Sequence, residues 1–309
     1  MSFFAFVPLK AFAWGPEGHR AIARVAMEEL EKVNPAAAAH VKEILGGESV
    51  EDASVWPDEV RTGRTHSGAL AKTQEGKDFN AAHPDNAMWH FVDLPLGVKS
   101  YAQDKRFQGE HDVVQMVGIC AQVLEGKSDF LTKKQALRCL IHFVGDMHQP
   151  LHVGSGYFKF GADGKAELVI DPDEALEEGV SKDNGANKLM QDKKLNFHRY
   201  VDENMVADVA PDVDKLTEVL RRDLVNVPTS KGAWKDWPTL WAMESVEASR
   251  VFYDGLTFGK RYPKLGSFWM VYVNFKPGAK EKFEGVVEEQ LTHAARHLTD
   301  LLGAIRWEK

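Results

Sequence analysis

This 309-residue chain centres on CLIHFVGDMHQPLH, which runs from Cys139 to His152. The spacing places His142 and Asp146 one turn apart on a helix, and Pro150 should end that helix so that His152 follows in the next turn. Most other positions in the segment are apolar, so the helix should be buried on most sides. A buried carboxylate without a cation or another partner is costly, and the segment therefore predicts a compensating charge beside Asp146.

A second pair of the same kind occurs in NFHRYVD, residues 196–202, where a histidine and an aspartate again stand four positions apart. The candidate metal ligands lie on five segments and are His19, Asp58, His90, His142, Asp146, His152, His198 and Asp202. Histidine and carboxylate without thiolate favour catalytic zinc, whereas each histidine alone could be a core imidazole bonded to a backbone carbonyl. His293 and His297 have no carboxylate at matching spacing, and we interpret them as a surface or capping pair.

The hydrophobic pattern predicts an all-α fold, a single mostly helical domain over residues 14–309 with long loops. Strands are scarce, and segment 88–95 is either strand-like or irregular. Two stretches are expected to be loops, namely 62–87 and the acidic insertion 155–184. Helical runs are expected at 20–32, 36–45, 112–124, 132–149, 212–225, 239–255 and 280–305.

Composition limits the location and the partners of the chain. The net charge is -8 and no Lys/Arg block advertises a nucleic-acid patch, although bound metal would change the local charge. Residues 1–13 end in Ala11-Phe-Ala13 and resemble the end of a secretory signal peptide that is cleaved before Trp14. No later stretch is long enough for a transmembrane helix. Cys120 and Cys139 are either one bridge or two buried thiols.

Five motifs together resemble the trizinc single-strand-specific nucleases and 3′-nucleotidases, a family that shares an α-helical fold with the zinc-dependent bacterial phospholipases C. The resemblance covers the chain in matching order from Trp14 to roughly the last helix. The motifs are Trp14 with His19, Trp-Pro-Asp58 with Arg61, Trp89-His-Phe-Val-Asp93, His142-Phe-Val-Gly-Asp146-Met-His-Gln-Pro-Leu-His152, and Asn196-Phe-His198-Arg-Tyr-Val-Asp202.

The resemblance implies three zinc ions. The first would be held by Asp58, His90, His142 and Asp146. The second would be held by the free amine and carbonyl of Trp14, His19 and a shared Asp146. The third would be held by His152, His198 and Asp202. Because an amine is needed at Trp14, the resemblance also implies that residues 1–13 are removed.

The activity implied by the resemblance is hydrolysis of single-stranded DNA and RNA to 5′-nucleotides, with 3′-nucleotidase activity, by a zinc-activated hydroxide that attacks phosphorus. Asp93 stands where the family has a carboxylate that orients the attacking water. Arg61 stands where it has a guanidinium near the phosphate, although an ion pair with Asp58 or Asp93 is the alternative. Phe91 would line a base pocket or be a core ring, and Asn187 would lie on the substrate side.

Two departures leave the choice of base and polymer open. The chain has Ala186 where the family usually has a second glycine, and the stretch 155–184 is longer than expected. A phospholipase C on the same fold is one alternative, but the short gap from Trp14 to His19 and the aspartate at Asp202 favour the nucleases. The other alternative is a metal-binding non-enzyme whose insertion occludes the site.

The expected location is secreted or periplasmic after cleavage before Trp14. The expected partners are single-stranded DNA and RNA and 3′-nucleotides. We expect no stable membrane insertion and no obligate protein partner.

Overall fold

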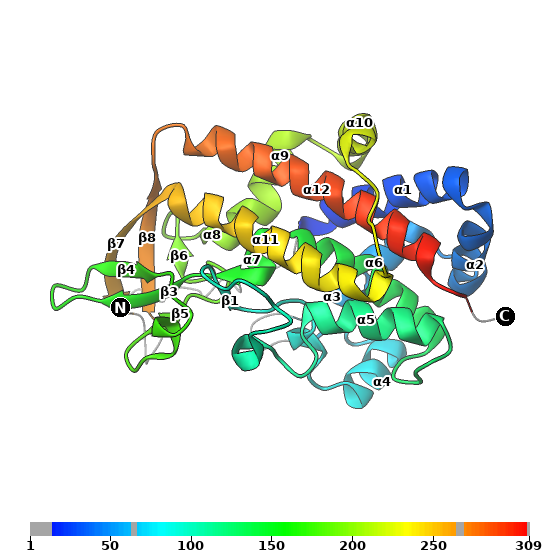
Figure 1. The fold of residues 1–309 in the computed structure, drawn as a ribbon, viewed down its shortest axis with the longest axis horizontal. Helices are drawn as coiled ribbons and strands as arrows, with labels where there is room; N and C mark the ends of the chain where they lie inside the picture. The colour runs from blue at the N-terminus through cyan, green and yellow to red at the C-terminus, as the bar shows by residue number, and fades with distance from the viewer. Residues whose placement is uncertain (1–13, 63–66, 264–268, 308–309) are drawn as a thin grey trace.

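The computed structural model describes residues 14–62, 67–263 and 269–307, so the expected leader 1–13 lies outside it. Long helices form the body of the molecule, and most strands gather at one end (Figure 1). The longer helices are α1 (Gly15–Val33), α2 (Pro35–Leu45), α3 (Val50–Val60), α4 (Gln74–Ala82), α5 (Val113–Leu124), α6 (Lys133–His148), α10 (Val213–Asp223), α11 (Trp237–Asp254) and α12 (Ala279–Ala304). The mostly helical prediction is confirmed.

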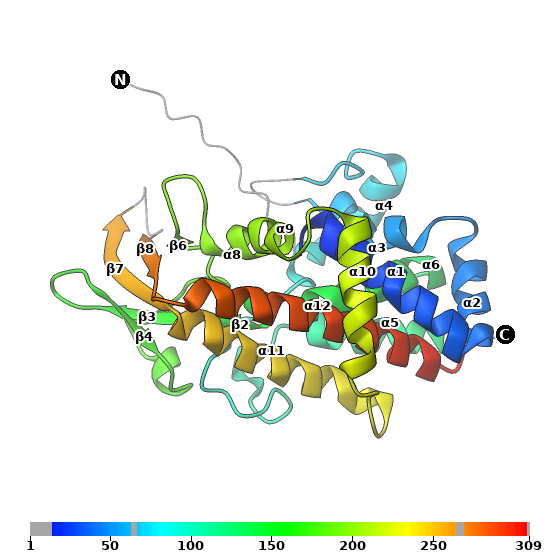
Figure 2. The same cartoon turned by 90° about the horizontal axis from the view of Figure 1, so that it is seen from above.

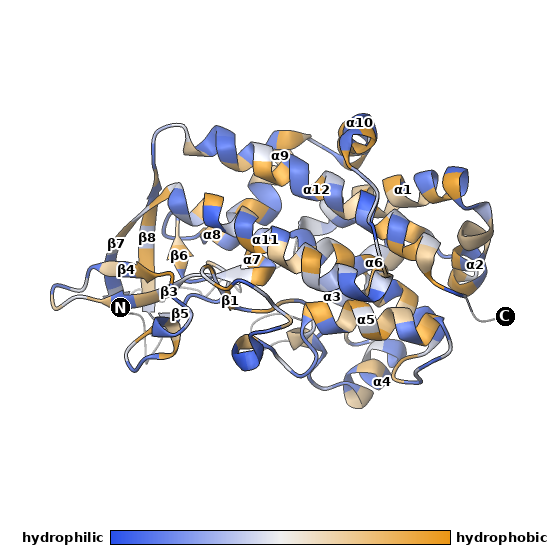
Figure 3. Cartoon of the chain, viewed as in Figure 1, coloured by the Kyte–Doolittle hydropathy of each residue, from blue (hydrophilic) through white to orange (hydrophobic). Residues whose placement is uncertain are grey.

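Shorter helical pieces complete the chain. They are α7 (Pro150–Val153), α8 (Phe197–Arg199), the π-helix Tyr200–Met205, α9 (Val206–Val209), and 3₁₀ turns at Asn86–Met88, Lys105–Phe107, Glu174–Leu176, Leu224–Asn226 and Trp234–Asp236. The main hydrophobic core lies beneath the helices, and a small second cluster consists of Tyr157, Val169 and Ala175. Hydrophilic and hydrophobic residues alternate along α12, which covers part of the main core (Figure 3). Helix α10 crosses α1 and α12 on the outside of the body (Figure 2).

The central helix α6 packs against α5, α3, α12 and α1. A capping box opens it, because the Thr132 hydroxyl accepts from the Gln135 backbone N–H and the Gln135 side chain accepts from the Thr132 backbone N–H. The helix ends just before Pro150, and α7 then begins at that proline. Every residue from 136 to 148 is buried. The predicted buried helix, followed by His152 in the next turn, is confirmed.

Three small sheets join segments that are far apart in the sequence. The strands are β1 (Leu94–Pro95), β2 (Gly154–Ser155), β3 (Tyr157–Phe160), β4 (Ala166–Val169), β5 (Ser181–Lys182), β6 (Leu189–Met190), β7 (Leu256–Pro263) and β8 (Trp269–Phe275). Strands β1 and β2 are parallel, β4-β3-β5 is antiparallel, and β8 lies between parallel β6 and antiparallel β7. The β1–β2 pair ties the chain after His90 to the chain after His152.

The prediction that 155–184 is a loop is wrong. Tyr157–Phe160 pairs with Ala166–Val169 and with Ser181–Lys182, so the segment is a three-stranded sheet. Most of the acidic residues lie in the connection 171–178 between β4 and β5. That acidic connection dominates the composition of the segment and hides the short strands on both sides of it.

Two further predictions need correction. The expected loop 62–87 contains α4, whose N-cap is Thr73. Phe79 is its one large buried side chain, so the helix has no apolar stripe that a pattern search would detect. Strands β7 and β8 were not predicted, and they form an antiparallel pair between α11 and α12.

Replacing the cap of the central helix should destabilise the protein. Thr132→Ala removes the acceptor for the Gln135 N–H and should lower the free energy of unfolding by about 1 kcal/mol. The measurement is a chemical denaturation curve, with Thr132→Ser as the control because serine keeps the hydroxyl. An unchanged midpoint for the alanine variant would show that the capping box contributes nothing.

Candidate metal centre

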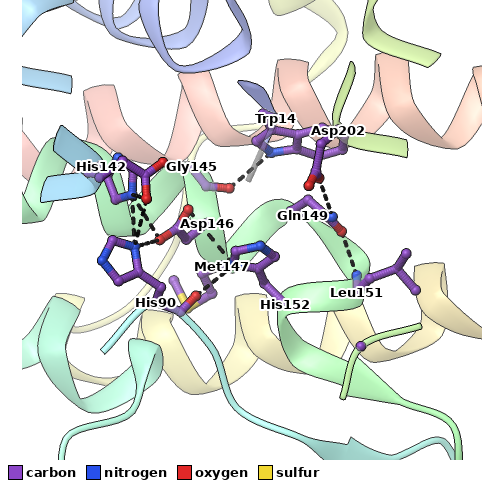
Figure 4. A network of polar contacts seen from close by, with 12 residues as sticks. Trp14, His90, His142, Gly145, Asp146, Met147, Gln149, Leu151, His152 and Asp202 are labelled. Carbon is purple, nitrogen blue, oxygen red and sulfur yellow. Dashed lines mark hydrogen bonds and ion pairs between the residues drawn. The ribbon is translucent and has the colours of Figure 1, made fainter. Parts of the chain in front are cut away.

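The buried carboxylate of Asp146 lies beside several candidate ligands, including His90 and His142 (Figure 4). Its Oδ2 lies 2.9 Å from His90 Nδ1 and 3.1 Å from His142 Nε2. Its Oδ1 lies 3.4 Å from His19 Nε2, on the other side of the carboxylate. Asp58 adds a second carboxylate, whose Oδ1 lies 3.7 Å from His90 Nδ1. The two oxygens of Asp146 therefore face two different sets of histidines.

A third cluster lies beyond the end of α6. The Nε2 of His198 is 3.3 Å from Oδ2 of Asp202, and the rings of His198 and His152 stack with centroids 5.0 Å apart. A π-helix follows His198 and carries Asp202, a local geometry that often occurs at functional sites. Gln149 fixes the other oxygen of Asp202 by donating to Oδ1 at 2.6 Å. The predicted pairing of His198 with Asp202 is therefore present in the structure.

Backbone carbonyls orient three of the imidazoles. Ser54 O lies 2.7 Å from Nδ1 of His142, His90 O lies 2.7 Å from Nδ1 of His152, and Gly185 O lies 2.6 Å from Nδ1 of His198. A carbonyl oxygen can only accept, so each Nδ1 must carry a proton, and Nε2 is the nitrogen that presents a lone pair when the ring is neutral. This is the arrangement in which a neutral imidazole binds a metal ion.

Unpaired buried atoms give an independent test of whether these residues fit a metal. Within the described part of the chain, several of their side-chain atoms are buried and have no hydrogen-bond partner. These are both ring nitrogens of His19, Oδ1 of Asp146, Nε2 of His152, Nε2 of His198 and Oδ2 of Asp202. Buried polar atoms are rarely left unpaired, and here they point into shared positions. The donor set is nitrogen and carboxylate oxygen, which suits zinc.

Ligand atoms within 4.8 Å of one another define three groups among the described residues. They are His19 with His142 and Asp146, Asp58 with His90 and His142, and His152 with His198 and Asp202. Every histidine and aspartate predicted from the sequence as a ligand belongs to one of them. The grouping differs from the predicted sets in two details. His142 belongs to two groups and stacks on the His19 ring with centroids 4.0 Å apart. Asp146 belongs to only one group, although its Oδ2 also lies 2.9 Å from His90 Nδ1.

Burial and neighbouring charges shift the pKa values of the histidines and aspartates in this centre. Burial would lower the pKa of His142, but the charges of Asp146 and Asp58 raise it to about 9. Burial would raise the pKa of Asp146, but the charge and hydrogen bond of His142 outweigh burial and hold that pKa well below its usual range. In the third cluster, burial and the neighbouring His152 lower the pKa of His198 to about 3, and burial raises the pKa of Asp202. A bound dication would favour ionised Asp202 and neutral imidazoles.

Trp14 contacts the central helix α6 and the third group. Its indole Nε1 donates to Gly145 O at 3.0 Å, and its backbone N–H donates to the Asp202 carboxylate. Its carbonyl accepts from the Gly18 N–H at 3.2 Å. The fold thus brings the predicted ligand Trp14 to the candidate metal centre. Its nitrogen is an amide in the full chain, so the predicted ligation through a free amine stays a prediction.

The residues predicted to act on substrate lie around this centre. Arg61 Nη2 is 3.0 Å from Oδ1 of Asp58, so the predicted alternative, an ion pair, is present. Asp93 accepts from Ser155 Oγ at 2.5 Å and from Lys182 Nζ at 2.6 Å. Neither of these two partners is a candidate metal ligand, and the role of Asp93 in orienting water stays a prediction.

A surface groove of about 520 Å³ begins at the chain that follows His90. It is lined by Phe91, Asp93, Phe107, Tyr157 and Lys182, among others. Phe91 is half-buried at its wall, so the predicted base-pocket position is compatible with its exposure. Asn187 is held by its hydrogen bonds to the backbone of Asn184 and to the side chain of Asn196.

Sequence reasoning missed several contributors. Gln149 belongs to the motif itself. Its hydrogen bond to Asp202 could have been predicted by assuming that the end of α6 faces the third cluster. Gly145 has a steric role, because a Cβ there would lie 2.7 Å from Nδ1 of His19. No local signal marked Lys182 or the backbone carbonyl acceptors, which are positioned by distant segments.

The interpretation of His293 and His297 as a surface or capping pair is wrong for His297. That ring is buried, lies 2.7 Å from His148 Nε2 through its Nδ1, and stacks on Trp241 with centroids 4.5 Å apart. Neither histidine joins a metal-binding group among the described residues. The two cysteines, Cys120 and Cys139, are buried and free, which confirms the prediction of buried thiols.

The fold and the centre define a class of mostly helical protein with adjoining His/Asp groups that could hold metal ions. The family model described as S1/P1 Nuclease matches residues 14–305, and the chain therefore belongs to the S1/P1 nuclease family. The family resemblance inferred from the sequence is confirmed. None of the helices in the described ranges is long and apolar enough to cross a membrane.

Several relatives carry nuclease names. The chain is 26% identical to Endonuclease 1 of Arabidopsis thaliana over 251 residues, which are 74% of this chain and 66% of that protein. It is 30% identical to Nuclease P1 of Penicillium citrinum over 142 residues, 45% of this chain and 47% of that protein. It is 24% identical to Endonuclease 2 of Arabidopsis thaliana over 281 residues, 80% of this chain and 79% of that protein. The chain thus spans about two thirds of Endonuclease 1 and about half of Nuclease P1.

Removing the shared carboxylate should empty two metal positions together. Asp146→Ala leaves His152, His198 and Asp202 intact, so we expect two of three ions to be lost and one to remain. Metal analysis of the dialysed protein by mass spectrometry measures this. Asp93→Asn, which changes a carboxylate outside the three groups, should keep all the metal. Loss of a single ion from the alanine variant would contradict a bridging role.

Proposed function

We propose that this protein is a zinc-dependent phosphodiesterase that hydrolyses single-stranded DNA and RNA to 5′-nucleotides and also acts as a 3′-nucleotidase. The observation that carries the proposal is the presence of three buried His/Asp groups, two of which contain buried ligand atoms without a hydrogen-bond partner. Membership of the S1/P1 nuclease family supports the reaction class.

The residues would hold three zinc ions. His19, with Trp14 once its amine is free, and Asp146 would hold one, and His152, His198 and Asp202 another. The remaining ion would be held by Asp58, His90 and His142, again with Asp146. Zinc bound there would supply Lewis-acid chemistry, lowering the pKa of a water molecule and neutralising phosphate charge.

The chain's own residues would orient the phosphate. Arg61 lies at the edge of the centre. Its Nη2 is 3.0 Å from Oδ1 of Asp58, and this ion pair fixes the guanidinium. A guanidinium held in place can donate two parallel hydrogen bonds to phosphate oxygens and stabilise the charge that develops at phosphorus. Asp93 would orient the attacking water or a substrate group. The bond broken would be the one between phosphorus and the 3′-oxygen, which leaves the phosphate on the 5′ side.

The groove beside Phe91 supports a preference for unpaired bases. Phe91 lines a space that also has the aromatic rings of Phe107 and Tyr157 on its walls. Stacking on such rings tolerates any base but requires that the base be free of its partner strand. A duplex presents no unstacked base, so single strands would bind better.

Processing and location follow from the requirement at Trp14. A free amine at this residue requires removal of residues 1–13, which read as a secretory leader. We therefore propose that the active protein begins at Trp14 and works outside the cytoplasm, either secreted or in a periplasm.

An activity panel tests the proposed function. Protein that begins at Trp14 should release acid-soluble nucleotides from heat-denatured DNA and from RNA, and should release phosphate from 3′-AMP, with chelation abolishing each activity. Native duplex DNA should be cut far more slowly. Hydrolysis of phosphatidylcholine without action on nucleic acid would favour the phospholipase alternative. Bound zinc without any turnover would favour the non-enzyme.

The proposed base pocket predicts a selective loss of binding. Phe91→Ala removes a stacking surface worth about 1–3 kcal/mol per base, so KM for a 3′-nucleotide should rise roughly 5- to 150-fold while the zinc content is unchanged. Steady-state kinetics measure the change. Met88→Ala is the matched control, since Met88 lines the same groove without an aromatic ring. Equal effects of the two variants would remove Phe91 from base recognition.

A further inference from the structure

Three consecutive residues between β5 and β6 have left-handed backbone conformations. The φ angles are 59° at Asn184, 58° at Gly185 and 61° at Ala186. Glycine accepts this region freely and asparagine tolerates it, but alanine is disfavoured there because its Cβ crowds the following carbonyl. A run of three such residues needs support from its surroundings.

This turn carries the acceptor that orients a candidate ligand. The Gly185 carbonyl lies 2.6 Å from Nδ1 of His198, so the direction of that carbonyl fixes where the His198 Nε2 points. The turn also packs closely on α7, because a Cβ at Gly185 would lie 2.1 Å from Leu151 O. A change in the turn would therefore move the imidazole of the third cluster.

Asp183 holds the turn from within the protein. It is fully buried, its Oδ1 accepts from the Ala186 N–H at 3.0 Å and from the Gly156 N–H at 3.1 Å, and its Oδ2 accepts from the Tyr253 hydroxyl at 2.8 Å. Through Asp183, these bonds connect Ala186, the last left-handed residue, to Gly156, which precedes β3, and to Tyr253 in α11. The Gly156 N–H also lies 2.8 Å from the Tyr253 oxygen, so the three partners form one closed set.

We propose that Asp183 is a positioning residue for the third metal group, because it holds residues 184–186 in the left-handed conformation that aims the Gly185 carbonyl at His198. The inference rests on the proposed metal centre. It also accounts for Ala186, the departure from a second glycine, since the hydrogen bond from the Ala186 N–H to Asp183 compensates a conformation that glycine would adopt without help.

A simple packing role would not require this arrangement. Burial raises the pKa of Asp183 to about 7, so the site is a costly one for a carboxylate. The carboxylate accepts hydrogen bonds from two backbone N–H groups and one hydroxyl. The bonds converge on the backbone of the turn. The hydrogen bonds that the carboxylate accepts from the backbone N–H groups explain why a carboxylate is retained at this buried position.

The proposal predicts a specific pattern of rescue. Asp183→Ala removes the acceptor for the Ala186 N–H, and the affinity of the third zinc should fall about 10- to 100-fold, the usual effect of losing a group that orients a metal ligand. Ala186→Gly in the same protein should restore most of that affinity, because glycine adopts a positive φ without the clamp. Asp183→Asn keeps an oxygen acceptor of the same shape and should retain three zinc ions.

The experiment uses the chain that begins at Trp14. Zinc per protein and zinc affinity are measured by competition with a chelator of known affinity, with circular dichroism to check folding. Tyr253→Phe is the control, since it leaves the Ala186 bond to Asp183 intact and should keep the third zinc. Restoration of zinc in Asp183→Ala by Ala186→Gly, with the single variant deficient, supports the proposal.

Three outcomes would overturn it. If the Asp183→Ala variant binds three zinc ions as tightly as the parent protein, residues 184–186 keep their conformation without Asp183. A deficiency that Ala186→Gly fails to relieve, or a double variant that does not fold, would show that Asp183 supports the core instead of the turn. A parent protein that binds no zinc would sink the proposed function itself, which separates failure of that function from failure of the clamp.

Discussion

The burial of the Asp146 carboxylate among three imidazoles is the constraint on which the rest of the structure depends. A carboxylate that is fully buried and not fully paired is unstable, so the chain must bring positive charge to it from elsewhere. His142 comes from the same helix, and His19 and His90 come from segments more than fifty residues earlier in the sequence. Protons can balance the charge in part, and the atoms of His19 and Asp146 that lack a hydrogen-bond partner could also bind a metal ion.

Several local features of the chain place the candidate ligands around this carboxylate. The capping box at Thr132 fixes where α6 begins, and Pro150 fixes where it ends, so the turn that carries His152 starts at a defined point. Strands β1 and β2 are only two residues long, yet their pairing holds the chain after His90 beside the chain after His152. A glycine at residue 145 lets the His19 ring approach the helix. Local structure, rather than a large sheet, thus positions the centre.

Spacing along one helix was enough to predict α6, its end and the ligands that it carries, because a period of 3.6 residues places His142 and Asp146 on one face. The helical body followed from the same pattern. The small sheet β4-β3-β5 did not, since strands of two to four residues leave little periodicity and the acidic connection 171–178 masks them. Nor could spacing reveal His297, whose burial depends on a partner in α6 and a tryptophan in α11.

The segment 155–184 looked like an appendage but is continuous with the site. Lys182 and Ser155 both bind the Asp93 carboxylate at the groove, and the Ser155 oxygen in turn accepts from the Gly185 N–H at 2.7 Å. The carbonyl of that same glycine orients His198. A hydrogen-bonded chain therefore runs from the substrate side to the third metal group through residues that are separated in sequence. Substitutions at the groove and at the metal centre should not be energetically independent, because residues that share such a network are coupled.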